Sequence, residues 1–213
     1  LSQNAGSAAA MHLAAALKKK PVKALLYYSC AKTSMHAAPV RLIRRLDLEG
    51  IRLAVIRREK WGDDAVKTAG AHHNWFAPTI GTLDAFAQPE IELVFYVNDA
   101  IKNGHFIRFN QYSHVLVATG VLAAAENLPR SIAMYDAVIA PTCAVAKKWR
   151  ESLPDYLSTK ILTVSEQPSD SVLNPLEALD QRLAVAPVGE IADFSDYPSL
   201  LVYLKESRLE GRR

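Results

Sequence analysis

Short apolar runs alternate along the chain with stretches that favour helix. Two of the helical stretches are 35–50, which ends on Gly50 as helices often do, and 144–153. Strands that are apolar throughout and are joined by helices indicate a mainly parallel sheet with helices on both faces. The sequence therefore predicts an α/β, Rossmann-like fold with six or seven strands. We expect strands near residues 22–28, 51–57, 91–97, 114–119, 137–140 and 160–164.

The pattern also suggests how the chain is divided. Residues 1–10 resemble a linker, and residues 11–170 hold the alternating strands and helices of one α/β domain. Residues 171–213 form a tail in which 183–189 favours a strand and 197–207 favours a helix. We expect this tail to be either the start of a second domain or a segment that returns to the first.

Composition is ordinary for a globular protein. The chain has 213 residues, of which 50% are hydrophobic and 22% are charged, enough for a sizeable core. No apolar run approaches the roughly 18 residues needed to cross a bilayer. The two cysteines, Cys30 and Cys143, indicate neither a disulfide framework nor a cysteine zinc site, so we expect a cytoplasmic protein.

Charge is unevenly distributed along the chain. Residues 1–60 hold 12 Lys and Arg against 3 Asp and Glu, whereas residues 61–213 hold 13 against 19. Arg41, Arg44 and Arg45 fall at helical spacing and share one face. That face is either simply solvated or binds an anionic partner, such as a membrane whose inner surface the protein would touch peripherally. We expect no nucleic acid, because aromatic residues do not alternate with the basic ones. The candidate anionic-surface residues are Lys18, Lys19, Lys20, Arg41, Arg44 and Arg45.

Familiar catalytic and nucleotide-binding motifs are absent. The first predicted strand is followed by SCAKTSMH (29–36), which lacks the glycines of a dinucleotide-binding turn. The sequence also contains no Gly-Lys-Ser/Thr, GxSxG or HExxH motif. Ser29, Thr33 and Ser34 in this turn either donate hydrogen bonds to a substrate or cap the next helix.

Two adjacent histidines are the densest polar group beside aromatic residues. His72 and His73 stand in AHHNWFAP (71–78), where the pattern fits neither strand nor helix clearly. Neighbouring residues of a strand face opposite ways, so at most one of them enters a given site. Each is either a structural residue, a ligand contact, a general base or a metal ligand. We expect no metal, because no further carboxylate or histidine stands at the spacing of a metal ligand.

Polar residues also follow two later strands. Asn98 and Asp99 close the predicted strand 91–97, and Asp99 either accepts a hydrogen bond or proton from a sugar hydroxyl or caps the next helix. Cys143 begins a predicted helix, a position that lowers a thiol pKa. Since no histidine is paired with it in the sequence, we expect Cys143 to be a small buried residue.

Three segments, taken together, resemble the N-terminal half of group 1 GT-B glycosyltransferases. They are AHHNWFAPTIGTLDAFAQ, VFYVNDAI and YDAVIAPTCAVAKKW, in the order in which that family has a His-rich segment, a His-Asp pair and a strand before a helix. The resemblance covers roughly residues 22 to 170 and implies the acceptor side of a sugar-transfer cleft. It implies that His72 or His73 converges with Asp99 and Thr142 on one pocket. The candidate contacts of the sugar acceptor are His72, His73, Asn98, Asp99 and Thr142.

The sequence departs from the family in ways that bear on activity. The family's glycine-rich loop is replaced by SCAKTSMH, its His-Asp pair reads Asn98-Asp99, and its Pro-Asn-Gly turn is lost. The family's sugar-nucleotide site lies in a C-terminal domain that this sequence does not contain. We therefore expect no cofactor in this chain, assign no catalytic residue, and expect sugar-nucleotide binding and hexosyl transfer only together with a C-terminal donor domain.

Two other hypotheses stay open. The chain could be a non-catalytic α/β interaction domain that binds a protein or an anionic surface through its basic N-terminal face. It could also be a small nucleotide-binding or hydrolytic enzyme of flavodoxin-like topology. Such an enzyme would hold its ligand at the first strand-to-helix turn, where glycine is missing.

Overall fold

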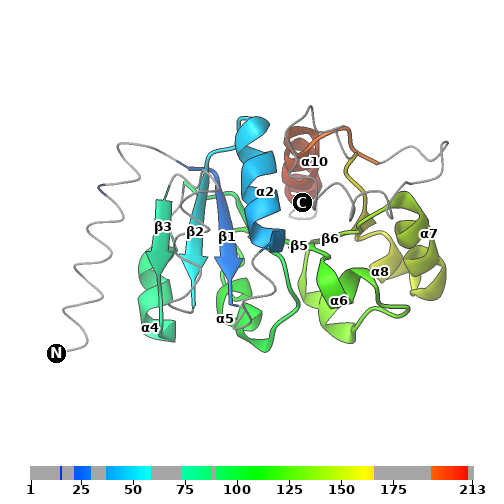
Figure 1. The fold of residues 1–213 in the computed structure, drawn as a ribbon, viewed down its shortest axis with the longest axis horizontal. Coiled ribbons are helices and arrows are strands. Elements are labelled where there is room, and N and C mark those ends of the chain that lie inside the picture. Colours follow the sequence, from blue (N-terminus) through cyan, green and yellow to red (C-terminus); the bar gives the residue numbers. More distant parts are fainter. Residues whose placement is uncertain are drawn as a thin grey trace.

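The described strands form one parallel sheet. The computed structural model describes residues 15, 22–29, 37–58, 73–87, 90–165 and 193–210. Within these ranges all neighbouring strands are parallel, in the order β3-β2-β1-β4-β5-β6-β7. This confirms the predicted α/β fold (Figure 1). The strands are β1 (Ala24–Tyr28), β2 (Leu53–Arg57), β3 (His73–Phe76), β4 (Leu93–Tyr96), β5 (Ser113–Val117), β6 (Ala137–Ile139) and β7 (Ile161–Leu162).

The order of the strands reverses between β1 and β4. From β1 the chain builds outward through β2 to β3, and then returns to place β4 on the other side of β1 and build outward again. This is the doubly wound arrangement, in which ligands bind outside the carboxyl ends of the strands at the point of reversal. The topology therefore directs attention to the carboxyl edge of β1 and β4.

Helices cover both faces of the sheet and enclose a separate core on each. On one face, α2 (Ala37–Leu48) and α10 (Tyr197–Glu210) pack against the apolar side chains of the strands. The opposite face is covered by shorter elements that include α4, η2, α5, η4 and α7. These elements and their neighbours are α4 (Ile80–Leu83), η2 (Asp84–Phe86), η3 (Ile101–Asn103), α5 (Gly104–Ile107), α6 (Gly120–Ala123), η4 (Arg130–Met134), α7 (Cys143–Ser152) and α8 (Asp155–Ser158).

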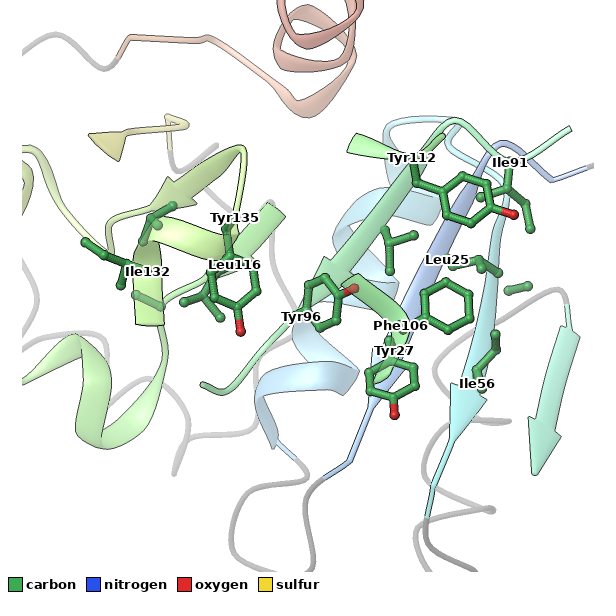
Figure 2. Packing of buried hydrophobic residues seen from close by; sticks show 14 of the residues in the cluster. Leu25, Tyr27, Ile56, Ile91, Tyr96, Phe106, Tyr112, Leu116, Ile132 and Tyr135 are labelled. Carbon is green, nitrogen blue, oxygen red and sulfur yellow. The ribbon is translucent and has the colours of Figure 1, made fainter. Parts of the chain in front are cut away.

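The second face has a core rich in aromatic rings. The ring centroids of Tyr27 and Phe106 lie 5.3 Å apart, and those of Tyr96 and Tyr135 also lie 5.3 Å apart. Figure 2 shows the side chains of Tyr27, Phe106, Tyr96 and Tyr135 among the buried residues of this core. A buried tyrosine hydroxyl needs a hydrogen-bond partner, and that of Tyr27 donates to the carbonyl oxygen of Lys102 at 3.0 Å. The core thus carries hydroxyl groups up to the carboxyl edge of the sheet.

The last helix returns to the sheet. The side chain of Glu49, just beyond α2, accepts a hydrogen bond from the backbone N–H of Tyr197 at 2.8 Å. Leu200 and Leu204 of α10 are buried in the core that α2 also covers. Gly50 follows α2 with φ at +77°, a conformation that glycine adopts at little cost and that ends the helix as the sequence predicted.

The predicted strands are confirmed, with ends that differ by one or two residues. The structure adds β3 in the segment that the pattern left ambiguous. Residues 1–10 and the predicted strand at 183–189 lie outside the described residues. Within the described ranges, no helix has the length and apolar character that crossing a membrane requires.

Candidate functional site

A row of polar residues lies on the carboxyl edge where the strand order reverses. The register of β1 with β2 and β4 places Ser29, Arg58 and Asn98, each just past its strand, at one level. Side chains alternate along a strand, so all three point to the face that carries Tyr27. Ser29 is only 6% exposed and Arg58 only 8%. Ligands of doubly wound sheets bind at this position, so these polar groups are candidates for a ligand site.

Asn103 connects this row to the rest of the edge. It is fully buried, at 0% exposure, and stands at the end of η3. Its Nδ2 donates to the carbonyl oxygen of Asn98 at 2.6 Å and to the hydroxyl oxygen of Tyr135 at 2.8 Å. Its Oδ1 accepts from the Ser29 hydroxyl at 3.2 Å. These partners fix the orientation of the amide and join the ends of β1 and β4 to the segment before β6.

Asp99 is held at the same edge by two hydroxyl groups. The Tyr135 hydroxyl donates to its Oδ1 at 3.2 Å, and the Ser131 hydroxyl donates to its Oδ2. Burial raises the pKa of Tyr135, so this hydroxyl stays protonated and donates. Asp99 does not cap the next element, because the N-cap of η3 is Ala100 and no side chain caps it. Each carboxylate oxygen has two lone pairs, so Asp99 can still accept from a ligand hydroxyl.

Arg58 brings a buried positive charge to the other end of the row. Its Nη1 donates to the carbonyl oxygen of Thr79 at 2.9 Å, while its Nε is buried and has no hydrogen-bond partner. Burial raises the pKa of Tyr27 to about 12, and the charge of Arg58 opposes that rise. Arg58 therefore places a positive charge on the face of the sheet that carries Tyr27.

Thr142 lies farther along the same edge. It caps α7, since its hydroxyl oxygen accepts from the backbone N–H of Val145 at 3.2 Å. β6 stands two strands from β4, a separation of roughly 10 Å. Cys143 is partly exposed rather than buried, and its Sγ lies 3.9 Å from the Oγ1 of Thr163. Thr142 thus shares the edge with Asp99 without touching the Asn103 network.

His73 lies away from the carboxyl edge of the sheet. It is the first residue of β3, and its ring stacks on that of Trp75 at 5.1 Å. It stands at the amino end of the outermost strand, roughly 10 Å along β3 from the carboxyl edge and about 14 Å across the sheet from β4. The structure therefore does not bring His73 to Asp99 and Thr142, because this histidine begins its strand instead of following it. His72 lies outside the described residues.

In the predicted basic face, two arginines are exposed and a third contacts other side chains. Arg41 and Arg44 are exposed on α2. The Nε of Arg45 pairs with Glu49 at 2.9 Å, and its guanidinium lies 5.0 Å from the centre of the Tyr197 ring. Arg45 thus attaches α10 to α2. The three lysines of this face lie outside the described residues: Lys18, Lys19 and Lys20.

Sequence reasoning missed Arg58 and the residues that hold the network. Arg58 follows a strand as Asn98 does, so the rule that selected Asn98 would also have selected it. Asn103, Ser131 and Tyr135 carry no comparable signal, because they lie in or beside 3-10 helices that only the tertiary fold brings to the edge. Over the ranges that the structure describes, no three His, Cys, Asp or Glu side chains are grouped so as to hold a metal.

Comparisons with known proteins show a likeness among solved structures. No protein-family model matches the chain, and no curated protein matches it either. Among solved structures, the chain is similar to a glycosyltransferase from Rickettsia africae ESF-5, with 12% sequence identity and a TM-score of 0.47. The match covers 79% of this chain and 51% of the other, so this chain spans about half the length of that protein.

Proposed function

We propose that this chain is the acceptor-side domain of a glycosyltransferase that a donor-binding domain completes. Three segments resemble group 1 GT-B glycosyltransferases, and they span 71–88, 94–101 and 135–149. Each contains all or most of a strand, β3, β4 or β6, and the residues that follow it. In one parallel sheet those ends share an edge. The three segments, far apart in sequence, therefore meet the same side of the sheet.

The observation that carries the proposal is the position of Asp99. Its carboxylate stands beside the reversal point, held by Ser131 and Tyr135, with lone pairs left for another donor. A sugar acceptor offers hydroxyl groups, which donate to a carboxylate in a strong, charge-assisted hydrogen bond. Asp99 would thereby orient the acceptor. Positioning of two substrates supplies much of the rate of a group transfer, and a donor domain would supply the second substrate.

Binding of saccharides to this chain tests the proposal. A panel of monosaccharides and disaccharides is titrated by calorimetry, and Asp99→Asn is compared with the wild type. Asn keeps the shape of Asp but removes the charge, worth about 1.5 to 3 kcal/mol in such a hydrogen bond, so affinity should fall roughly 10-fold to 150-fold. Asp47→Asn is the matched control, because Asp47 is exposed on α2 and should leave affinity unchanged.

Three outcomes would count against this function. Wild-type protein that binds no saccharide, or Asp99→Asn that binds as well as the wild type, would remove the acceptor role. Transfer from a sugar nucleotide by this chain alone would contradict the division between acceptor and donor domains.

A further inference from the structure

Arg58 is a buried cation with little to balance it. It is 8% exposed, and among the described residues its guanidinium donates to a neutral group, the backbone carbonyl of Thr79. No ion pair joins Arg58 to a carboxylate within the described ranges. Arginine is almost never fully buried unless it is paired, because removing its charge from water costs several kcal/mol. An anion that binds here would offset that cost.

The free edge of the guanidinium has the geometry for such an anion. Nη1 is occupied by Thr79, while Nε is buried without a partner. Nε and Nη2 form one side of the planar group, where two N–H bonds run parallel and match two oxygen atoms of a phosphate or carboxylate. A buried, unsatisfied N–H on that side is the donor that an anionic oxygen would take.

A complementary acceptor lies on the same row. The Oδ1 of Asn98 is also buried and has no hydrogen-bond partner. Asn98 and Arg58 stand at one level on either side of β1, so their backbones are two strands, or roughly 10 Å, apart. One end of the row therefore lacks an acceptor and the other lacks a donor. A molecule with an anionic group at one end and hydroxyl groups at the other would satisfy both.

We propose that Arg58 binds the anionic group of a hydroxylated, sugar-like acceptor, and that Asn98 accepts a hydrogen bond from one of its hydroxyl groups. The anionic group is a phosphate ester or a carboxylate, which present the same oxygen geometry to a guanidinium. This deepens the proposed function and rests on it for the identity of the ligand as the acceptor. The anion site itself rests on the burial and the free Nε of Arg58.

The test compares charged and neutral sugars on the whole chain. Glucose 6-phosphate, glucuronate, glucose and inorganic phosphate are titrated by calorimetry, and the Nε–H signal of Arg58 is followed by NMR. We expect at least one of the two charged sugars to bind about tenfold or more tighter than glucose and to shift that signal. The tighter of the two identifies the group as phosphate or carboxylate.

A matched pair of variants locates the effect. Arg58→Gln should lower the affinity for the preferred charged sugar about tenfold or more, to the level of glucose. Arg52→Gln should change nothing, because Arg52 is exposed just before the start of the same strand, at the opposite edge of the sheet. If Arg58→Gln does not fold, the titration of the wild-type Nε–H signal decides alone.

The outcomes separate this inference from the proposed function. Equal binding of glucose and both charged sugars, or an Nε–H signal that no anion shifts, would overturn the anion site. It would leave the acceptor role of Asp99 standing if neutral saccharides still bind. If inorganic phosphate binds and none of the sugars does, the anion site stands. The assignment of the ligand as a sugar acceptor is then overturned, and with it the proposed function.

Discussion

Replacing Asn103 with alanine should strongly destabilise the domain. Asn103 is fully buried, and its amide makes three hydrogen bonds, with Ser29, the backbone of Asn98 and Tyr135. Alanine removes all three at once. The Tyr135 hydroxyl keeps its bond to Asp99, but the Ser29 hydroxyl and the Asn98 carbonyl each lose a partner.

The magnitude follows from those two groups. A buried polar group left without a partner costs about 1 to 3 kcal/mol, and a water that enters the vacated space recovers part of that cost. We therefore expect the free energy of unfolding to fall by about 2 to 5 kcal/mol for Asn103→Ala. A domain of this size is stable by only about 5 to 15 kcal/mol, so the change is large.

Urea unfolding followed by tryptophan fluorescence measures this change, since Trp149 is buried in the same core. The control is Asn110→Ala, an exposed asparagine six residues beyond Gly104, which should change the unfolding free energy by no more than about 0.5 kcal/mol. If Asn103→Ala cost less than about 1 kcal/mol, the three bonds would not hold the edge together. The network would then be a weak basis for a site.

Two further predictions follow. The Nδ1 of His114 lies 2.9 Å from the Tyr96 hydroxyl, and burial lowers the pKa of His114, so the unfolded chain takes up the proton first as pH falls below 6.5. The free energy of unfolding should therefore decrease below pH 6.5, by about 1.4 kcal/mol for each unit of pKa lowering. His114→Gln should make the unfolding free energy depend less on pH in this range. Urea titrations in which the variant shows the same pH dependence as the wild type would contradict the reasoning. We also propose that the exposed Arg41 and Arg44 bind anionic membranes, with Arg45 excluded because Glu49 engages it. Replacing both with Gln should weaken sedimentation with phosphatidylserine vesicles roughly 30-fold, whereas equal binding to phosphatidylcholine would refute the proposal.

The strands were predictable where burial is complete. Both faces of β1, β2 and β4 are covered, so these strands read as continuous apolar runs. β3 lies at the edge of the sheet and is half-exposed, and it admits the polar side chains of His73 and Asn74. Its pattern is therefore weak, and His73 could not be placed at the start of the strand from sequence alone.

The contacts of a side chain were less predictable than the place of its residue in the fold. Asn98 and Asp99 were found because residues that follow a strand reach the carboxyl edge of a parallel sheet. Helical spacing correctly put Arg41, Arg44 and Arg45 on one helix. It could not show that α10, about 150 residues later, packs against Arg45 and partly covers its side chain. Likewise, only the tertiary fold brings Tyr135 to Asp99.

Arg58 and Asp99 would together set the direction of a bound acceptor. Arg58 lies on the β2 side of the reversal point, and Asp99 lies on the β4 side. Charges about 10 Å apart interact by roughly 1.7 kcal/mol at an effective dielectric constant of 20. An anionic group at the Arg58 end is thus attracted there and repelled from Asp99, and both effects favour one orientation. The hydroxyl end then lies beside Asp99, where a carboxylate accepts from it. A neutral acceptor would lack this preference, so the Asp99→Asn variant should lose orientation as well as affinity for a charged one.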